Sequence, residues 1–315
     1  MNPSGSPSSS PSSSPSPSPS PSPSPSPSLG PDACRPCVLV FAGLDPSGGA
    51  GLSADLQAIA GQGAHALTVV TALTVQDNDR VWGVHPVASA LLRQQALALI
   101  DKFAISAIKI GITGSAENAQ AIADLIVQLR REQPQLPVVL DPVLASGHGD
   151  LLSRDDAVQA LAPLLPLATV LTPNEPEAQA LTDRSSVAAQ MQRLREQGCQ
   201  HVLLTGGHSD GEVVLNRWFG PQAAQDAEPE AEPEAEPNAK PSAEPNALRE
   251  WRWQRLAGGF HGSGCTLASA LAGQLAMQVP LALALDAAQA YCHAALAGAY
   301  AIGSGQRIPA RSAYF

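Results

Sequence analysis

Short apolar runs alternate along the chain with longer stretches in which apolar residues recur every three or four positions. The short runs are rich in Val, Ile, Leu and Thr, which is typical of strands buried on both faces. Strands are therefore expected at residues 38–43, 67–75, 107–111, 138–143, 168–174 and 201–208. Helices are expected after the Gly-rich turn at residues 44–51, at 88–103, at 117–131 and after residue 174. This alternation predicts an α/β fold.

The later part of the chain follows a different pattern. Residues 212–219 and 251–256 read as the two strands of a hairpin whose tip carries a long insertion. Such insertions are tolerated at exposed loop tips because closing a longer loop costs little extra entropy. The Ala-rich run at residues 267–301 is interrupted by Pro280 and predicts two helices that pack through small residues.

Two segments are too biased in composition to contribute to a core. Residues 1–33 are almost entirely Ser and Pro, and residues 223–247 repeat Ala, Glu and Pro. Because neither segment has enough apolar side chains to bury, both are expected to be disordered. Residues 34–315 are then expected to form a single domain, interrupted by the disordered insert at about 223–247.

Charge and composition exclude several classes of function. The acidic insert carries seven acids and one lysine, which account for −6 of the formal net charge of −10. The remainder is only mildly acidic and lacks the basic face of a nucleic-acid-binding protein. No apolar run approaches the roughly 18 residues of a membrane span, and the first thirty residues resemble no secretory signal. The chain is therefore expected in the cytoplasm, where an odd number of scattered cysteines is tolerated.

A Gly-rich turn at residues 261–266, here called the anion loop, has the sequence His-Gly-Ser-Gly-Cys-Thr and runs directly into an apolar helix. Gly262 and Gly264 let backbone N–H groups approach a ligand, and the start of the helix favours negative charge. At a helix start the pKa of the Cys265 thiol is expected to be lowered, which suits phosphoryl transfer. The alternative is a structural helix start capped by Ser263, with a small buried cysteine.

Polar residues follow several of the predicted strands. In open α/β sheets ligands bind beyond the carboxyl ends of the strands, which is where Gln76 and Asp141 are expected. Gln76 offers a donor and an acceptor together, although a solvated loop glutamine is the alternative. Asn174 and Glu177 are three residues apart in a first helical turn. They suit either a hydrated Mg²⁺ or a structural capping box, and both interpretations stay open.

Seven motifs occur in a fixed order between about residues 38 and 308, and together they are more specific than any one of them. They read Gly-Leu-Asp-Pro-Ser-Gly-Gly-Ala-Gly, Val-Thr-Ala-Leu-Thr-Val-Gln, Lys-Ile-Gly, Leu-Asp-Pro-Val, Thr-Pro-Asn-Glu-Pro-Glu-Ala, Thr-Gly-Gly-His and His-Gly-Ser-Gly-Cys-Thr. With them the chain resembles the hydroxymethylpyrimidine and phosphomethylpyrimidine kinases of thiamine synthesis, which belong to the ribokinase-like superfamily. The resemblance implies a central, mostly parallel sheet flanked by helices on both faces, ATP with Mg²⁺, and a homodimer.

The resemblance also implies roles for individual residues. Those expected to bind the pyrimidine are Gln76, Gly43, Ala50, Asp55 and Val143. Those expected to act in phosphoryl transfer are Cys265 as base and Gly262, Ser263 and Gly264 with their amides. Those expected on the nucleotide or phosphate side are Asp141, Thr205 and Gly207, and the expected metal-side pair is Asn174 and Glu177. Two positions differ from many relatives, which carry Met in place of Ile112 and Lys in place of Thr205.

The implied activity is ATP-dependent phosphorylation of 4-amino-5-hydroxymethyl-2-methylpyrimidine and then of its monophosphate. A pyridoxal-type kinase on the same fold is the first alternative, and Gln76 argues against it because a vitamin B6 ring lacks the amino group that this side chain would bind. A non-catalytic pyrimidine sensor is the second alternative. The anion loop, Asp141 and the Asn174 and Glu177 pair argue against lost catalysis.

The composition generates a first prediction, on the two biased segments. Deleting residues 1–31 or 223–247 should leave kcat within a small factor of the full-length value, because neither segment can add to a packed core. Steady-state kinetics of each shortened protein, with a thermal melt to confirm folding, provide the measurement. A folded but inactive shortened protein would contradict the expectation.

Overall fold

We describe the protein from a computed structural model, which covers residues 34–144, 156–209, 211–221 and 247–312. The Ser/Pro tail and the acidic insert up to residue 246 lie outside the described residues, so the expected disorder of both segments stays a prediction.

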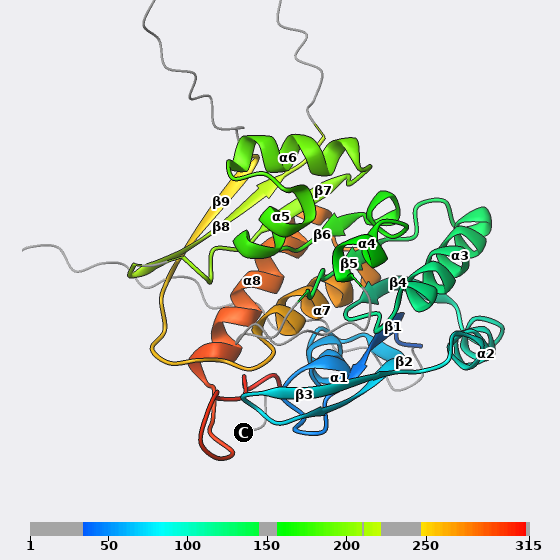
Figure 1. The fold of residues 1–315 in the computed structure, drawn as a ribbon, viewed down its shortest axis with the longest axis horizontal. Coiled ribbons are helices and arrows are strands. Elements are labelled where there is room, and N and C mark those ends of the chain that lie inside the picture. The colour runs from blue at the N-terminus through cyan, green and yellow to red at the C-terminus, as the bar shows by residue number, and fades with distance from the viewer. Residues whose placement is uncertain (1–33, 145–155, 210, 222–246, 313–315) are drawn as a thin grey trace, which may run out of the picture.

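The described strands form one nine-stranded sheet in the order β3-β2-β1-β4-β5-β6-β7-β8-β9 (Figure 1). The pairings from β2 through β7 are parallel, whereas β3 pairs with β2, β8 with β7 and β9 with β8 in antiparallel fashion. The strands are β1 Cys37–Leu44, β2 His65–Gln76, β3 Val81–Pro86, β4 Ile105–Ile110, β5 Val138–Leu140, β6 Val170–Leu171, β7 His201–Leu204, β8 Val213–Phe219 and β9 Arg249–Gln254.

Helices cover both faces of the sheet, and each face has its own hydrophobic core. On one face lie α1 Gly51–Gly61, α7 Ser263–Ala276 and α8 Leu281–Ala297. On the other lie α2 Ser89–Ile100, α3 Ala116–Glu132, α4 Ala157–Leu161, α5 Glu175–Thr182 and α6 Val187–Glu196, with a short 3₁₀ turn at Leu165–Leu167. No helix in these described ranges combines the length and the apolar character needed to cross a bilayer.

Strand β1 shows why the central runs are continuously apolar. Val38 and Val40 pack into the core under α1, α7 and α8, whereas Leu39 and Phe41 pack into the core on the opposite face. Because successive side chains of a strand point to opposite faces, a strand covered on both sides needs apolar residues at every position. The predicted α/β fold with a mostly parallel sheet and helices on both faces is confirmed.

The predicted elements are present, with shifted ends. The six predicted strands correspond to β1, β2, β4, β5, β6 and β7, and the predicted hairpin to β8 and β9. Strand β3 and helices α4 and α6 were not predicted. β3 follows a polar turn, contains Gly83 and ends at Pro86, so its own residues give only a weak strand signal. It is a strand because it pairs with β2.

This topology decides where the site lies. Strands β1, β2, β4, β5, β6 and β7 run parallel, so their carboxyl ends meet at one edge of the sheet. The segments that follow β4, β5, β6 and β7 therefore start side by side. The described part of the chain places the anion loop at the same edge, at the start of α7.

Candidate active site

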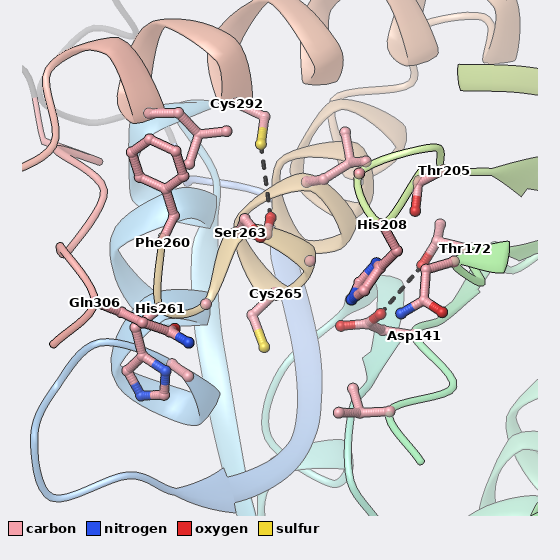
Figure 2. Close-up of a pocket in the computed structure, with 18 of the residues that line it drawn as sticks. Asp141, Thr172, Thr205, His208, Phe260, His261, Ser263, Cys265, Cys292 and Gln306 are labelled. Carbon is pink, nitrogen blue, oxygen red and sulfur yellow. Dashed lines mark hydrogen bonds between the residues drawn. The ribbon is translucent and has the colours of Figure 1, made fainter. Parts of the chain in front are cut away.

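A cavity of about 800 Å³ extends along the carboxyl edge of the sheet, from Gln76 at the end of β2 to Trp253 on β9. Figure 2 shows its middle part, with Ser263 and Cys265 on one side and Asp141, Thr205 and His208 facing them. Nearly all of the site residues expected from the sequence line this cavity. They are Gly43, Ala50, Gln76, Asp141, Val143, Asn174, Glu177, Thr205, Gly207, Gly262, Ser263, Gly264 and Cys265.

The anion loop is open toward the cavity. Helix α7 begins at Ser263, and its first helical hydrogen bond runs from the Thr266 N–H to the Gly262 carbonyl, at 2.9 Å. The amides of residues 263–265 therefore precede the helical hydrogen-bond ladder, and no side chain caps the helix. The structural alternative, in which Ser263 caps the helix, is wrong, because the N-cap residue is Gly262. Amides that precede the helical ladder at the start of a fourteen-residue helix are groups that can bind an anion.

Gly262 is required by the way this loop packs. Its φ of 80° lies in the left-handed region, and a Cβ atom there would stand 2.1 Å from the Gly49 carbonyl oxygen. Arg311, which is 1% exposed, lies against the same contact. Its Nη2 donates to the Gly49 and Gly262 carbonyls, and its Nε donates to Thr266 Oγ1 at 2.7 Å. Arg311 thus joins the loop before α1 to the start of α7.

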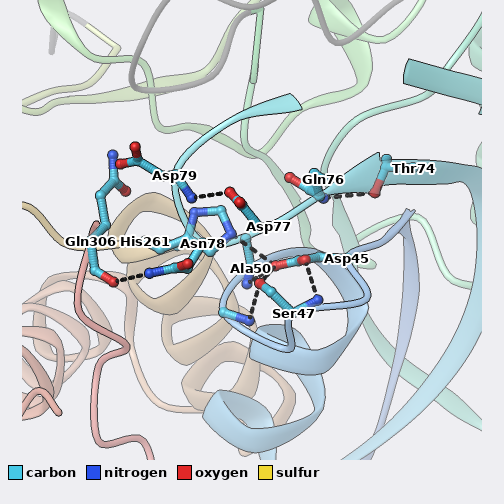
Figure 3. A network of polar contacts seen from close by, with 12 residues as sticks. Asp45, Ser47, Ala50, Thr74, Gln76, Asp77, Asn78, Asp79, His261 and Gln306 are labelled. Carbon is cyan, nitrogen blue, oxygen red and sulfur yellow. Dashed lines mark hydrogen bonds and ion pairs between the residues drawn. The ribbon is translucent and has the colours of Figure 1, made fainter. Parts of the chain in front are cut away.

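A second contact holds the anion loop from its other side. His261 Nε2 lies 2.8 Å from Asp45 Oδ2, and Asp45 also accepts hydrogen bonds from the Ala50 amide and the Ser47 hydroxyl (Figure 3). Burial would raise the pKa of Asp45, but the hydrogen bonds from His261, Ser47 and Ala50 outweigh it and lower that pKa. Asp45 is therefore a fixed anion that orients His261.

Gln76 presents one donor and one acceptor to the cavity. Its Nε2 lies 2.7 Å from Thr74 Oγ1 (Figure 3). The Thr74 hydroxyl donates to the Leu44 carbonyl at 2.8 Å. Because that hydroxyl has a single hydrogen, its oxygen can only accept from Gln76, which fixes the orientation of the amide. Among the described residues, the Gln76 carbonyl oxygen and its second N–H have no partner and are available for a ligand.

The structure corrects the expectation for Asp55, which does not line the cavity. Asp55 is 0% exposed, and its carboxylate is 2.9 Å from Lys109 Nζ and 2.6 Å from Ser269 Oγ. Lys109 is also 0% exposed and does line the cavity. Sequence reasoning missed Lys109 as a site residue, although a lysine inside an otherwise apolar strand is a signal for a buried, paired charge.

Lys109 carries a permanent positive charge beneath the anion loop. Burial alone would lower its pKa, but the carboxylate of Asp55, with Cys265 and Asp141, outweighs burial and raises that pKa. The ammonium group therefore stays protonated throughout the physiological range. A fixed cation of this kind, removed from bulk water, stabilises charge that develops on a transferring phosphoryl group.

The structure contradicts the expectation that the pKa of Cys265 is lowered. Burial is the main cause that raises it, and together with the negative charges of Asp141 and Asp55 it outweighs Lys109 and brings the pKa to about 12. Cys265 is therefore a neutral thiol near pH 7. Burial and Asp55 raise the pKa of Asp141 to about 6, against the lowering influence of Lys109, Thr172 and Cys265.

Asn174 and Glu177, the pair expected on the metal side, form a capping box, which is one of the two interpretations that the sequence left open. Asn174 Oδ1 accepts from the Glu177 amide and Glu177 Oε2 accepts from the Asn174 amide, each at 2.9 Å. Burial, followed by the charge of Asp141, raises the pKa of Glu177 to about 8. In the parts of the chain that the structure describes, no cluster of three or more His, Cys, Asp or Glu side chains is arranged as a metal site. The carboxyl groups of Asp141, which is buried, and of Glu177, which is half-buried, nevertheless fit a hydrated cation between protein and phosphate.

Beyond Asp141 the cavity is lined by Thr205 and Gly207, the other two residues expected on the nucleotide side, and by Arg255, which was not identified from the sequence. Thr205 Oγ1 donates to the Pro173 carbonyl at 3.4 Å, and Gly207 lies in the turn after β7. Arg255 holds this turn by donating to the Gly207 carbonyl at 2.9 Å and to the Gly211 carbonyl at 2.7 Å. The guanidinium of Arg255 thus lines the same cavity as Thr205, which itself carries no charge.

Known proteins resemble this chain over most of its length. A family model described as phosphomethylpyrimidine kinase matches residues 45–310. The hydroxymethylpyrimidine/phosphomethylpyrimidine kinase of Rhizobium meliloti is 35% identical over 275 residues, which cover 85% of this chain and 93% of that protein.

Two solved structures have the same fold. The phosphomethylpyrimidine kinase of Clostridium difficile superposes with a TM-score of 0.62 at 27% identity, covering 81% of this chain and 97% of that one. A Staphylococcus aureus pyridoxal kinase in complex with AMP-PCP and pyridoxal superposes with a TM-score of 0.67 at 23% identity, covering 90% and 95%. At that identity the likeness to the pyridoxal kinase shows the fold alone.

The buried ion pair generates a prediction on stability. Asp55→Asn should lower the free energy of unfolding by about 3–5 kcal/mol, because it leaves the Lys109 charge buried without a counter-charge. The double variant Asp55→Asn/Lys109→Met should lose less than Asp55→Asn alone, since it removes both charges. Urea denaturation gives the measurement. Asp124→Asn, in the exposed pair with Arg93, is the control and should cost under about 1 kcal/mol. Additive losses at Asp55 and Lys109 would show that the two charges are not coupled.

Proposed function

Because the chain belongs to the phosphomethylpyrimidine kinase family, we propose that it phosphorylates a hydroxymethylpyrimidine with ATP and then phosphorylates the monophosphate to the pyrophosphate. The product would supply the pyrimidine half of thiamine. One observation carries the proposal: the anion loop faces the middle of a single cavity whose two ends have different chemistry. An acceptor and a nucleotide can therefore approach the same amides from opposite directions.

The acceptor end is suited to an aminopyrimidine. The free carbonyl oxygen of Gln76 can accept from the exocyclic amine, while its free N–H donates to the neighbouring ring nitrogen. Gly43 lets the Ile112 side chain pack directly against the backbone at this end of the cavity, since a Cβ atom at position 43 would stand 2.4 Å from Ile112 Cδ1. Pyridoxal has no such amine, so it would leave the oxygen of Gln76 unpaired.

In the middle of the cavity the protein would stabilise the transferring phosphoryl group. The amides of residues 263–265 point at the developing negative charge, and Lys109 adds a fixed positive charge behind them. Little covalent chemistry is required of the protein in such a transfer, because positioning and charge stabilisation supply most of the rate.

The acceptor hydroxyl has to lose its proton as the new O–P bond forms. Cys265, with a pKa of about 12, can take that proton only if it releases its own. We place the receiving group at Asp141, which has a pKa of about 6 and whose Oδ2 has no hydrogen-bond partner among the described residues. The hydroxyl proton would pass to the Cys265 sulfur while the thiol proton passes to the Asp141 carboxylate.

Mg²⁺ fits the proposal as the partner of the nucleotide phosphates. When bound, it would neutralise part of the polyphosphate charge. Glu177 would hold it through water, beside Asn174, because a nearby cation removes the penalty that burial and Asp141 place on the Glu177 carboxylate. Thr205, Gly207 and Arg255 would then face the nucleotide.

We also infer that residues 34–315 form one catalytic domain and that the protein acts as a homodimer in the cytoplasm. Apolar side chains are exposed along β2 and β3, at Leu73 (50%), Val75 (51%) and Trp82 (66%), and a second copy would cover them. The odd and scattered set of five cysteines supports the cytoplasmic location, because a reducing compartment tolerates such a set.

A coupled ATP-consumption assay with the hydroxymethylpyrimidine, its monophosphate and pyridoxal as acceptors tests the proposed function. The first two should turn over, and pyridoxal should be a poor acceptor. Gln76→Ala should raise KM for the pyrimidine about 5- to 150-fold, the effect of leaving buried polar groups unpaired, with KM for ATP unchanged. Preferred turnover of pyridoxal would make the protein a vitamin B6 kinase, and pyrimidine binding without turnover would make it a sensor.

The proton relay predicts that Cys265 matters for only one of the two phosphorylations. Cys265→Ala keeps the backbone amides and should lower kcat/KM for the alcohol about 10²- to 10⁴-fold, the usual contribution of proton transfer. The monophosphate should be affected much less, because a phosphate with a second pKa of about 6 is already mostly ionised at neutral pH. Cys265→Ser should retain part of the first activity, since a hydroxyl can also accept and pass on a proton. Equal losses with both acceptors would assign Cys265 to the anion loop alone.

A further inference from the structure

We propose that the side-chain amide of Gln289 recognises the purine base of the nucleotide by donating a hydrogen bond to one of its ring nitrogens. Gln289 is on α8, is 2% exposed and lines the end of the cavity farthest from Gln76. The inference rests on the proposed function, because it takes the ligand at this end to be the phosphoryl donor.

The hydrogen bonds around Gln289 fix which way its amide points. The indole N–H of Trp253, which can only donate, lies 3.2 Å from Gln289 Oε1. The Asn216 Nδ2 donates to the same oxygen at 2.8 Å, and Asn216 Oδ1 accepts from the Gly206 amide at 3.1 Å. Two obligatory donors, an indole and a backbone amide, therefore set the orientation of both side-chain amides.

This arrangement leaves the Gln289 Nε2 with two hydrogens and no acceptor. The atom is buried, and it has no hydrogen-bond partner in the described part of the chain. A buried donor without a partner is costly, so such a group in the wall of a cavity points to a ligand that supplies the acceptor.

The surroundings of Gln289 suit a flat aromatic ligand. Trp253 stacks on His293, with ring centroids 4.6 Å apart and an interplanar angle of 27°. His293 is four residues after Gln289 on α8, so both lie on the same face of the helix. Val214 and Leu296 add apolar surface to this end of the cavity.

The order of the strands puts the Gln289 end of the cavity on the side where the phosphoryl donor would bind. Gln76 is on β2 and Trp253 is on β9, on opposite sides of β4, where Lys109 lies beneath the anion loop. A nucleotide whose phosphates reach the anion loop from the β7 turn would extend its base toward β8, β9 and α8. The adenine ring offers acceptors at N1, N3 and N7, and any one of them can meet the Gln289 amide.

Binding of ADP and its 1-deaza, 3-deaza and 7-deaza analogues to the wild-type protein, measured by calorimetry, tests the proposal. Each analogue replaces one ring nitrogen by C–H. We expect one of the three to bind about tenfold more weakly than ADP, as when a buried donor loses its partner. Three analogues that bind as tightly as ADP would overturn the proposal without any variant being made.

The variant Gln289→Met then assigns the effect to this side chain. In the variant, ADP and the sensitive analogue should bind with the same affinity, whereas the other two analogues should keep their ratio to ADP. Equal weakening for ADP and all three analogues would mean a structural role and would overturn the proposal. Gln274→Met, on α7 and outside the cavity lining, is the matched control and should leave the analogue series unchanged.

Failure of the proposed function has a different signature. If wild-type ADP binding is absent while the pyrimidine binds, the cavity does not take a nucleotide donor and the proposed function fails as well. If ADP binds and no deaza analogue is discriminated, the kinase proposal stands and only the role of Gln289 is lost. A thermal melt of Gln289→Met confirms that the variant is folded.

Discussion

The buried ion pair between Lys109 and Asp55 is the interaction on which the site depends. Lys109 lies on β4 and Asp55 on α1, and the hydroxyl of Ser269 on α7 donates a hydrogen bond to Asp55. Two charges at 0% exposure are tolerated only when each has its partner in place. The pair therefore fixes how α1 and α7 sit on the sheet, and with α7 it fixes the direction in which the anion loop faces.

The residues that line the cavity are spread along the carboxyl edge of the sheet. Gln76 ends β2, Lys109 lies on β4, Asp141 follows β5, and the turn after β7 with β8 and β9 forms the other end of the cavity. Because the pairings from β2 through β7 are parallel, these groups meet without any one segment having to contain them all. Gln76 and Gln289 lie at opposite ends of the cavity, and hydrogen bonds to neighbouring side chains fix the orientation of both amides.

Much of the fold and of the cavity lining could be predicted from the sequence, because the patterns that indicate them lie within short stretches of chain. Gln76 and Asp141 were found since polar residues that end buried strands converge at the carboxyl edge. The role of Lys109 and the position of Asp55 were not found, because a charge that is paired deep in a core is specified by contacts between elements more than fifty residues apart. The pKa of Cys265 was predicted with the wrong sign for the same reason. The helix start is a local feature, but its effect on the pKa is outweighed by burial and by two carboxylates, Asp55 on α1 and Asp141 after β5.

The contacts by which Arg311 joins the loop before α1 to the start of α7 affect the order in which the protein folds during synthesis. Its guanidinium holds the Gly49 carbonyl across 262 residues of chain, so the loop before α1 and the start of α7 reach their final arrangement only after both ends of that interval exist. Synthesis at 5–20 residues per second needs roughly 13–50 s to cover this interval. During that time β1, α1 and the first strands of the sheet can already pair, because their contacts span shorter distances. The growing chain can therefore form most of its sheet before Arg311 is available to join the loop before α1 to the start of α7.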